Sequence, residues 1–224
     1  MFSGKPTRAI AAGAAVIAIA GGGYGIVGAA SGSNSAPAAT TANPPKTGGA
    51  RSGPAAGGAV GTVGTVSTSS FTVTTSAGQK VTVDESSSTT YVKGTTSTTS
   101  SAVTKGASVL VLGTVSGKTI KATQVTVQPT GISKSSAVVP FKRGAPSTAK
   151  QVGKIPSNYV QGSGTIVSGT TANKATQAAL AAYPGGIVDR VVKLSNGEYE
   201  VHNIGVNWPH HIFVNTSFKV VGAN

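Results

Sequence analysis

Short runs in which β-branched or aromatic residues alternate with polar ones are the feature that most constrains this fold. Between residues 59 and 128 these runs follow one another closely, separated by Ser-Thr-Ser-Ser, Ala-Gly-Gln and Ser-Gly sequences that are typical of tight turns. Because successive side chains of a strand point to opposite faces, each run predicts a strand with one buried face. About five or six such strands joined by short turns predict a small antiparallel β-barrel or sandwich.

The order of these runs also resembles a known type of domain. The segments 70–73 (SFTV), 81–84 (VTVD), 105–113 (KGASVLVLG) and 120–125 (IKATQV) carry the resemblance. Their order is similar to that of an uncharacterised family of exported bacterial domains with OB-like β-barrels. The resemblance implies an OB-like barrel over residues 59–128 and export from the cytoplasm, and it implies no activity.

A different pattern covers residues 170–224. The Ala-rich stretch 174–183 has high helix propensity, and Pro-Gly-Gly stops it. Strand-like runs follow at 187–194 and 198–204, joined by an Asn-Gly pair that favours a tight hairpin, with shorter runs at 211–214 and 218–221. We therefore expect a helix packed on an antiparallel sheet of about three or four strands. The chain as a whole is expected to be mainly β, with an α+β C-terminal module.

This C-terminal part resembles the PepSY domain family, which occurs in peptidase propeptides and in free-standing exported proteins. The segments 179–186 (ALAAYPGG), 197–202 (GEYEVH), 212–215 (IFVN) and 218–220 (FKV) carry the resemblance. The chain departs from the family at 205–211, where an Asp-Gly turn is usual, and at Asn215, where an aspartate is common. The resemblance implies restraint of a peptidase or binding at the cell surface, without catalytic residues. No part of the chain resembles a peptidase, so restraint within the same chain is excluded.

The N-terminal residues 1–30 predict export. Lys5 and Arg8 precede the uncharged stretch 9–30, whose centre is apolar, and small residues follow at 27–31. This arrangement is typical of a cleaved signal peptide, and the stretch is also long enough to be an uncleaved membrane anchor. Both alternatives place the rest of the chain outside the cytoplasm, either secreted or anchored, and limit membrane contact to residues 9–30.

Two segments have the composition of linkers. Residues 31–58 are dominated by Ala, Gly, Ser, Pro and Thr, which predicts a disordered tether. Residues 129–169 contain several prolines among Ser and Gly and predict an irregular connector. The patterns leave open whether residues 160–169 belong to the C-terminal domain.

Charge and cysteine content exclude several classes of function. The chain carries a net charge of +13 with five acidic residues, but its lysines are scattered, so we expect no nucleic-acid binding. The excess charge favours an anionic envelope polymer or an unknown envelope protein as partner. Without cysteine there is no disulfide framework, thiol nucleophile or zinc knuckle, and we expect no cofactor.

The three histidines, His202, His210 and His211, are weak candidates for metal ligands. Adjacent residues of a strand point to opposite faces. His210 and His211 can therefore both lie near His202 only if the strand begins between them, at His211. With no cysteine or inward carboxylate predicted nearby, we expect no metal site. The hairpin residues Glu198 and Glu200 are expected to face solvent.

Four residues are candidates for partner binding: Trp208, His210, His211 and Tyr199. Trp208 is the only tryptophan and precedes a proline in a turn. Its indole either serves as an exposed anchor or folds back onto the sheet beside Tyr199 or Phe213. No serine lies in an activating motif, so no catalytic residue is predicted. We expect a non-enzymatic envelope protein with a binding or regulatory role; the alternatives are a passive, glycosylated structural protein and a hydrolase of unknown type.

Overall fold

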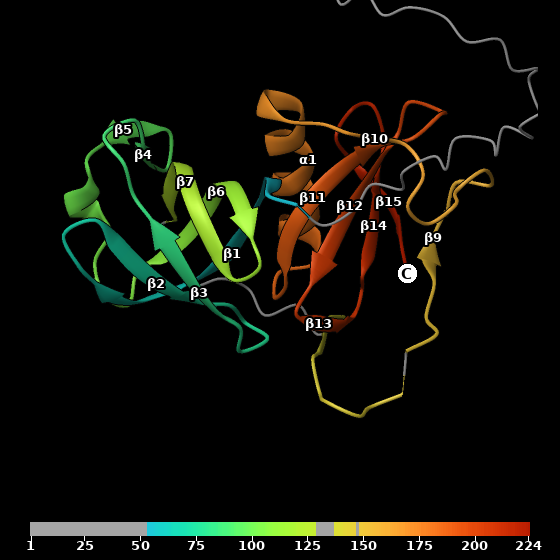
Figure 1. The fold of residues 1–224 in the computed structure, drawn as a ribbon, viewed down its shortest axis with the longest axis horizontal. Coiled ribbons are helices and arrows are strands. Elements are labelled where there is room, and N and C mark those ends of the chain that lie inside the picture. Colours follow the sequence, from blue (N-terminus) through green and yellow to red (C-terminus); the bar gives the residue numbers. More distant parts are fainter. Residues whose placement is uncertain (1–52, 129–136, 147) are drawn as a thin grey trace, which may run out of the picture. The chain divides into compact units, whose positions relative to one another are not determined.

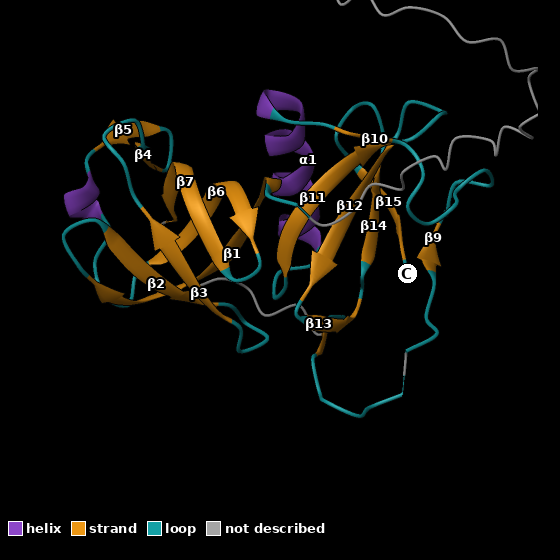
Figure 2. Ribbon diagram, in the orientation of Figure 1, coloured by secondary structure: helices purple, strands orange, loops and turns teal. Residues whose placement is uncertain are grey.

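The computed structural model describes residues 53–128, 137–146 and 148–224 (Figure 1). The predicted export segment and residues 31–52 of the predicted tether lie outside the described residues. Figure 2 shows that the described chain is mainly β, as expected, with a single α-helix in that part. Pro45–Asn224 forms one compact unit. Among the described residues no helix is both long and apolar enough to cross a membrane.

The alternating runs of the first region form strands, as predicted. These elements are β1 (Ala55–Val66), β2 (Ser70–Thr74), β3 (Lys80–Asp84), β4 (Thr90–Lys93), β5 (Thr96–Thr98), the 3-10 helix η1 (Ser100–Ala102), β6 (Ser108–Ser116) and β7 (Thr119–Gln128). The inward residues form one apolar core that includes Val63, Phe71, Val83, Val111 and Ile120.

Strand pairing in this region follows a cycle. β1 pairs with β2, and β2 pairs with β3. β3 pairs in parallel with β7, β7 pairs with β6, and β6 pairs with β1, which closes the cycle. The 13-stranded sheet as a whole is not a barrel, because β1 also pairs with β11 and the ladder continues from there to β9.

The first strand begins inside the segment expected to be a tether. Residues 55–58 are the start of β1, so the predicted boundary at 58 is wrong. At Gly57 a Cβ would overlap the backbone carbonyl of Val188, and at Gly58 one would overlap the carbonyl of Val111. The Gly-rich composition therefore reflects close contact between strands, because only glycine allows the backbones to approach so closely.

The described residues from 137 onward contain one α-helix and several strands. They are β8 (Val139–Pro140), β9 (Val152–Gly153), β10 (Thr165–Ile166), α1 (Gly169–Ala182), β11 (Ile187–Lys193), β12 (Tyr199–Ile204), β13 (Val206–Trp208), β14 (His211–Val214) and β15 (Val220–Ala223). The helix begins five residues before the predicted stretch and ends one residue before its predicted end. Ala175, Ala179 and Leu180 of α1 pack against Val201 and Ile212 of the sheet.

The segment expected to be an irregular connector contributes strands to this sheet. β8 pairs with β13, β9 with β15, and β10 with β11. Ile155 and Tyr159 pack against Phe213 on the face of the sheet opposite α1. Residues 160–169, whose membership the sequence left open, therefore include a strand of the C-terminal sheet.

The two folded regions share a ladder. Gly58 pairs with Val188, and Ala59 pairs with Ile187. The Oγ1 of Thr75 also donates a hydrogen bond to the carbonyl of Gly185. These contacts join the first region to the start of β11.

Candidate binding site

Charged and titratable side chains gather on one face of the C-terminal sheet. Arg190, His202 and His211 are successive partners across β11, β12 and β14. Directly opposed residues of neighbouring strands project from the same face. The neighbouring positions Val201 and Ile212 point the other way, into the core beneath α1. The sheet thus has an apolar face against the helix and a second face that carries a cation and two imidazoles.

Each of the two imidazoles on this face is paired with a carboxylate. The Nδ1 of His202 lies 2.6 Å from Oδ1 of Asp189, and the Nδ1 of His211 lies 2.7 Å from Oε1 of Glu200. The two ring centroids are 5.3 Å apart, with planes tilted by 53°. Among the described residues no hydrogen bond involves the Nε2 of either ring. A neutral ring that donates its Nδ1–H to a carboxylate keeps a lone pair on Nε2.

A β-bulge brings Asp189 to this face. The register between β11 and β12 shifts between Val188 and Arg190, so one residue is inserted. Such a bulge re-aims a side chain that regular alternation would place on the opposite face. The side chains of both Asp189 and Arg190 therefore lie on this face of the sheet. Their Nη1 and Oδ2 atoms are 3.4 Å apart. The Nε of Arg190 is buried and has no hydrogen-bond partner in the part of the chain that the structure describes.

The connector covers the second carboxylate. Glu200 is only 1% exposed, so the prediction that it faces solvent is wrong. Tyr159 packs edge-on against Phe213, with ring centroids 4.7 Å apart, and its hydroxyl lies 3.1 Å from Nδ1 of His211. Burial, and then the negative charge of Glu200, raises the pKa of Tyr159 above its usual value. Its phenol therefore stays protonated around neutral pH.

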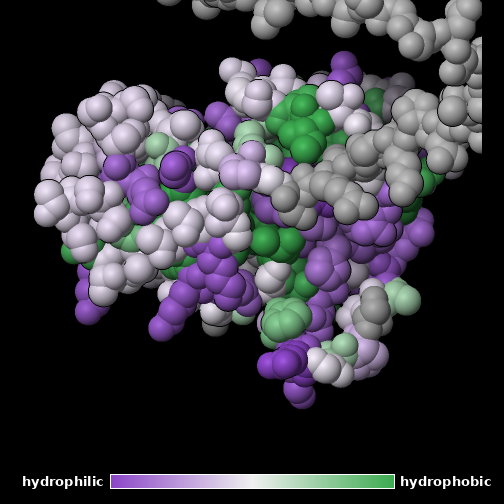
Figure 3. All heavy atoms as spheres, in the orientation of Figure 1, coloured by the Kyte–Doolittle hydropathy of each residue, from purple (hydrophilic) through white to green (hydrophobic). Residues whose placement is uncertain are grey.

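These imidazoles open onto a pocket of about 690 Å³. Its lining consists of Thr148, Ala149, Lys150, Gln151, Gln161, His202, Asn207, Trp208, His210, His211 and Asn224. We call this cavity the histidine pocket. The space-filling view shows hydrophilic residues gathered over parts of the C-terminal strands, beside the paler surface of the first region (Figure 3).

All three histidines line this pocket. β14 begins at His211, so the condition under which His210 and His211 both join His202 is met. His210 lies in the turn before the strand, and its Nδ1 is 3.2 Å from the carbonyl oxygen of Asn203. Desolvation lowers the pKa of His210, and the two neighbouring histidines add to the effect. Within the described ranges no group of three or more His, Cys, Asp or Glu residues is arranged to hold a metal ion.

Trp208 forms part of the pocket wall and is not a protruding anchor. Its side chain is 1% exposed, and its Nε1–H donates to the carbonyl of Lys150 at 2.6 Å. The indole meets Tyr183 edge-on, with centroids 5.4 Å apart, and the Lys150 ammonium lies 4.6 Å from the ring centroid. The structure therefore shows the folded-back alternative, with Tyr183 as the neighbour in place of Tyr199 or Phe213.

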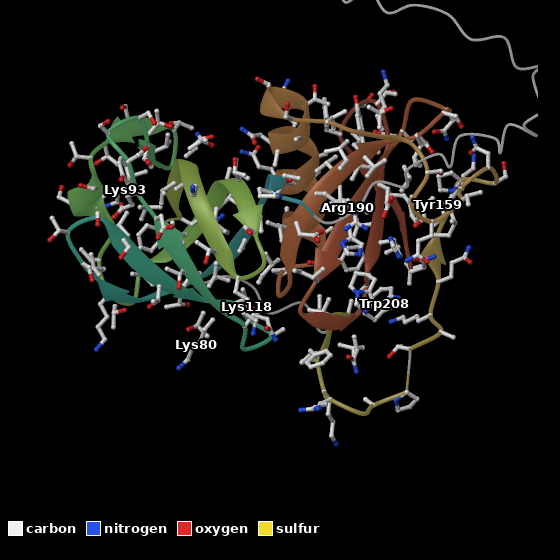
Figure 4. All side chains as sticks on the ribbon, viewed as in Figure 1. Lys80, Lys93, Lys118, Tyr159, Arg190 and Trp208 are labelled. Atoms are coloured by element: carbon white, nitrogen blue, oxygen red, sulfur yellow. The ribbon has the colours of Figure 1, made fainter. Side chains whose placement is uncertain are left out.

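Tyr199 lies away from the other candidates. It belongs to the core beneath α1 and stacks on Phe218 with centroids 5.5 Å apart. Figure 4 shows Arg190, Tyr159 and Trp208 in the C-terminal region, apart from Lys80, Lys93 and Lys118 in the first region. The sequence patterns did not indicate Asp189, Arg190 or Tyr159. The one local signal was that Asp189, one of only five acidic residues, stands beside Arg190.

Comparisons of the chain with protein-family models, with curated proteins and with solved structures found no match.

Proposed function

We propose that this chain is an exported, non-enzymatic binding protein of the bacterial cell envelope, and that the histidine pocket takes an anionic ligand. The observation that carries the proposal is the polarity of the lining. Lys150, three imidazoles and several amide side chains line the pocket, whereas no Asp or Glu side chain does. The acids Asp189 and Glu200 bind the Nδ1 atoms of the imidazoles.

The charge of the whole chain supports an anionic ligand. A net charge of +13 attracts polyanions over long range, and this attraction weakens as salt screens it. A pocket with donors and one ammonium group adds short-range contacts for phosphate or carboxylate groups. An anionic envelope polymer is therefore the partner we propose.

A binding role fits the local chemistry better than hydrolysis. Among the described residues no serine or threonine hydroxyl bonds to His202, His210 or His211, so none of these rings is placed to activate one. The pairs formed with Asp189 and Glu200 instead orient the imidazoles toward the pocket.

The proposal includes finer assignments of fold. The cycle of strand pairs through β1, β2, β3, β7 and β6 supports an OB-like barrel in the first region. The packing of α1 over β11, β12 and β14 supports a PepSY-like arrangement in the second. Both likenesses agree with an exported binding protein, and neither brings catalytic residues.

The sole tryptophan provides the test, because Trp208 lines the histidine pocket. A short linear polyphosphate is titrated into the full chain while indole fluorescence is followed. Lys150→Gln removes the ammonium beside the ring and should weaken binding about tenfold, as expected for one charge-assisted contact. Lys93→Gln is the matched control, because it removes the same charge from β4, away from the pocket (Figure 4). Equal losses in both variants, or no response of Trp208, would contradict a pocket-bound anion.

A further inference from the structure

We propose that His202 and His211 together bind one divalent transition-metal ion through their Nε2 atoms. The inference rests on the proposed function in that it assigns a ligand to the same pocket. Both residues line the histidine pocket, and both Nε2 atoms lack a hydrogen bond within the described part of the chain. Neutral imidazole nitrogen is the commonest metal ligand in proteins.

The spacing of the rings suits a shared ion. A metal–nitrogen bond of about 2.0–2.1 Å and a tetrahedral angle place two ligating imidazole centroids about 5 Å apart. The centroids of His202 and His211 are 5.3 Å apart. The register of β12 and β14 fixes this distance, because the two residues are direct cross-strand partners.

Both rings already have the support that metal-binding histidines need. The Nδ1 of His202 contacts Asp189 at 2.6 Å, and the Nδ1 of His211 contacts Glu200 at 2.7 Å. A carboxylate that accepts the Nδ1–H fixes the tautomer, directs Nε2 toward the ion and increases the basicity of the ligand. Two such pairs side by side supply this support twice.

The charges on the Nδ1 side of the two rings favour a cation, whereas Lys150, the cation of the pocket wall, lies over the Trp208 ring. With neutral imidazoles, Asp189 and Glu200 supply two negative charges, and Arg190 offsets one of them. A buried negative balance is compensated when a dication binds. Water and the anionic ligand of the pocket would fill the remaining coordination positions, since two protein ligands leave a tetrahedral site open. Imidazole ligands favour zinc, copper or nickel over magnesium or calcium.

Zinc chloride is the probe, titrated by calorimetry into the full chain carrying no histidine tag. We expect one ion per chain. His202→Gln should abolish most of the binding, and Asp189→Asn should weaken it about 10- to 100-fold by removing the carboxylate support. Asp84→Asn is the matched control for Asp189→Asn, because it removes the same charge from β3 in the first region and does not line the pocket, and it should change affinity less than about twofold.

Circular dichroism of each variant verifies that it is folded, and Asp189→Asn keeps the test valid if His202→Gln is unstable. Absence of zinc binding by the folded wild-type chain would overturn the inference, as would an equal loss in Asp84→Asn and Asp189→Asn. Polyphosphate binding without zinc binding refutes the metal site alone. Zinc binding without polyphosphate binding supports the metal site and refutes the proposed anion binding.

Discussion

The first region and the C-terminal region bury different kinds of polar group. Residues 55–128 bury only hydroxyls among their polar side chains, those of Thr75, Thr89 and Ser108. The C-terminal region buries Arg190 and Glu200, as well as His211 and Asn203. A hydroxyl is satisfied by one hydrogen bond, as when Thr89 donates to the carbonyl of Ala122 at 2.9 Å. Removing a charged group from water costs several kcal/mol of folding free energy unless a partner compensates for it.

This difference distinguishes the first region from the region in which we propose a binding site. The first region has a continuous apolar core, and residues 55–128 bury no charged side chain. The second region has the same kind of core beneath α1 but places charged groups on its other face. Replacing a buried ion pair by well-packed apolar residues of similar volume is often neutral or stabilising, so stability alone does not require these charges.

The largest expected effect comes from removing a buried ring from either region. Phe71→Ala and Trp208→Ala should each lower the free energy of unfolding by about 3–5 kcal/mol. Both rings are at most 2% exposed. Urea unfolding followed by circular dichroism measures the loss. Under conditions where both variants are folded, only Trp208→Ala should lose polyphosphate binding, which is measured by calorimetric titration because this variant contains no tryptophan. A Trp208→Ala variant as stable as the wild type would show that the indole is not part of the core.

The ladder between the regions provides the next test. A side chain at Gly57 would overlap the carbonyl of Val188 in β11, so Gly57→Ala should weaken this junction at a cost of about 1–3 kcal/mol. Calorimetry should show one transition for the wild type and a lower or divided transition for the variant. Gly53→Ala is the control, because its added Cβ has no atom within 4 Å. Identical melting of the two variants would contradict the shared ladder.

A smaller effect concerns acid stability at His210. Desolvation lowers its pKa from the ordinary value of 6.5, so the unfolded chain binds more protons than the folded one. The stability contributed by the neutral ring is complete above about pH 6.5 and declines as the pH falls from there to the folded pKa. The decline is small because His210 is exposed. His210→Gln should lose less stability than the wild type between about pH 7.5 and pH 5. Parallel losses would contradict the lowered pKa.

The smallest effect belongs to the first region. Burial, and next the bond from the Tyr91 hydroxyl to Glu85 at 2.7 Å, raises the pKa of Tyr91 to about 12. Glu85→Gln should lower that pKa only in part, since burial remains. A spectrophotometric titration of phenolate measures the shift. An unchanged titration in Glu85→Gln would show that the carboxylate makes no contribution.

The fold was predictable where local pattern determined it. Alternation located the strands around Val73 and Val83, and Ala-rich composition located α1. The start of β1 was missed because Gly57 and Gly58 have no side chains to alternate, although their smallness is what the neighbouring strands require.

The candidate site was predictable only in its histidines and in Trp208. Their grouping in the sequence indicated a patch, but the face of Glu200 depends on a covering segment around Tyr159 that no local pattern assigns. Asp189 reaches the site through a bulge, which breaks the alternation on which strand prediction relies. Long-range pairing and irregular backbone therefore account for the parts that were missed.

The most direct test of the central claim replaces the buried pair itself. In Glu200→Leu/His211→Leu both hydrogen-bonded partners become apolar, in a region that already contains Phe213 and Val192. We predict a free energy of unfolding that is unchanged or higher by about 1–4 kcal/mol, together with loss of zinc and polyphosphate binding. Urea unfolding and calorimetric titration of the same sample measure both quantities. A double variant that loses several kcal/mol of stability yet still binds both probes would show that the pair is structural and that the site lies elsewhere.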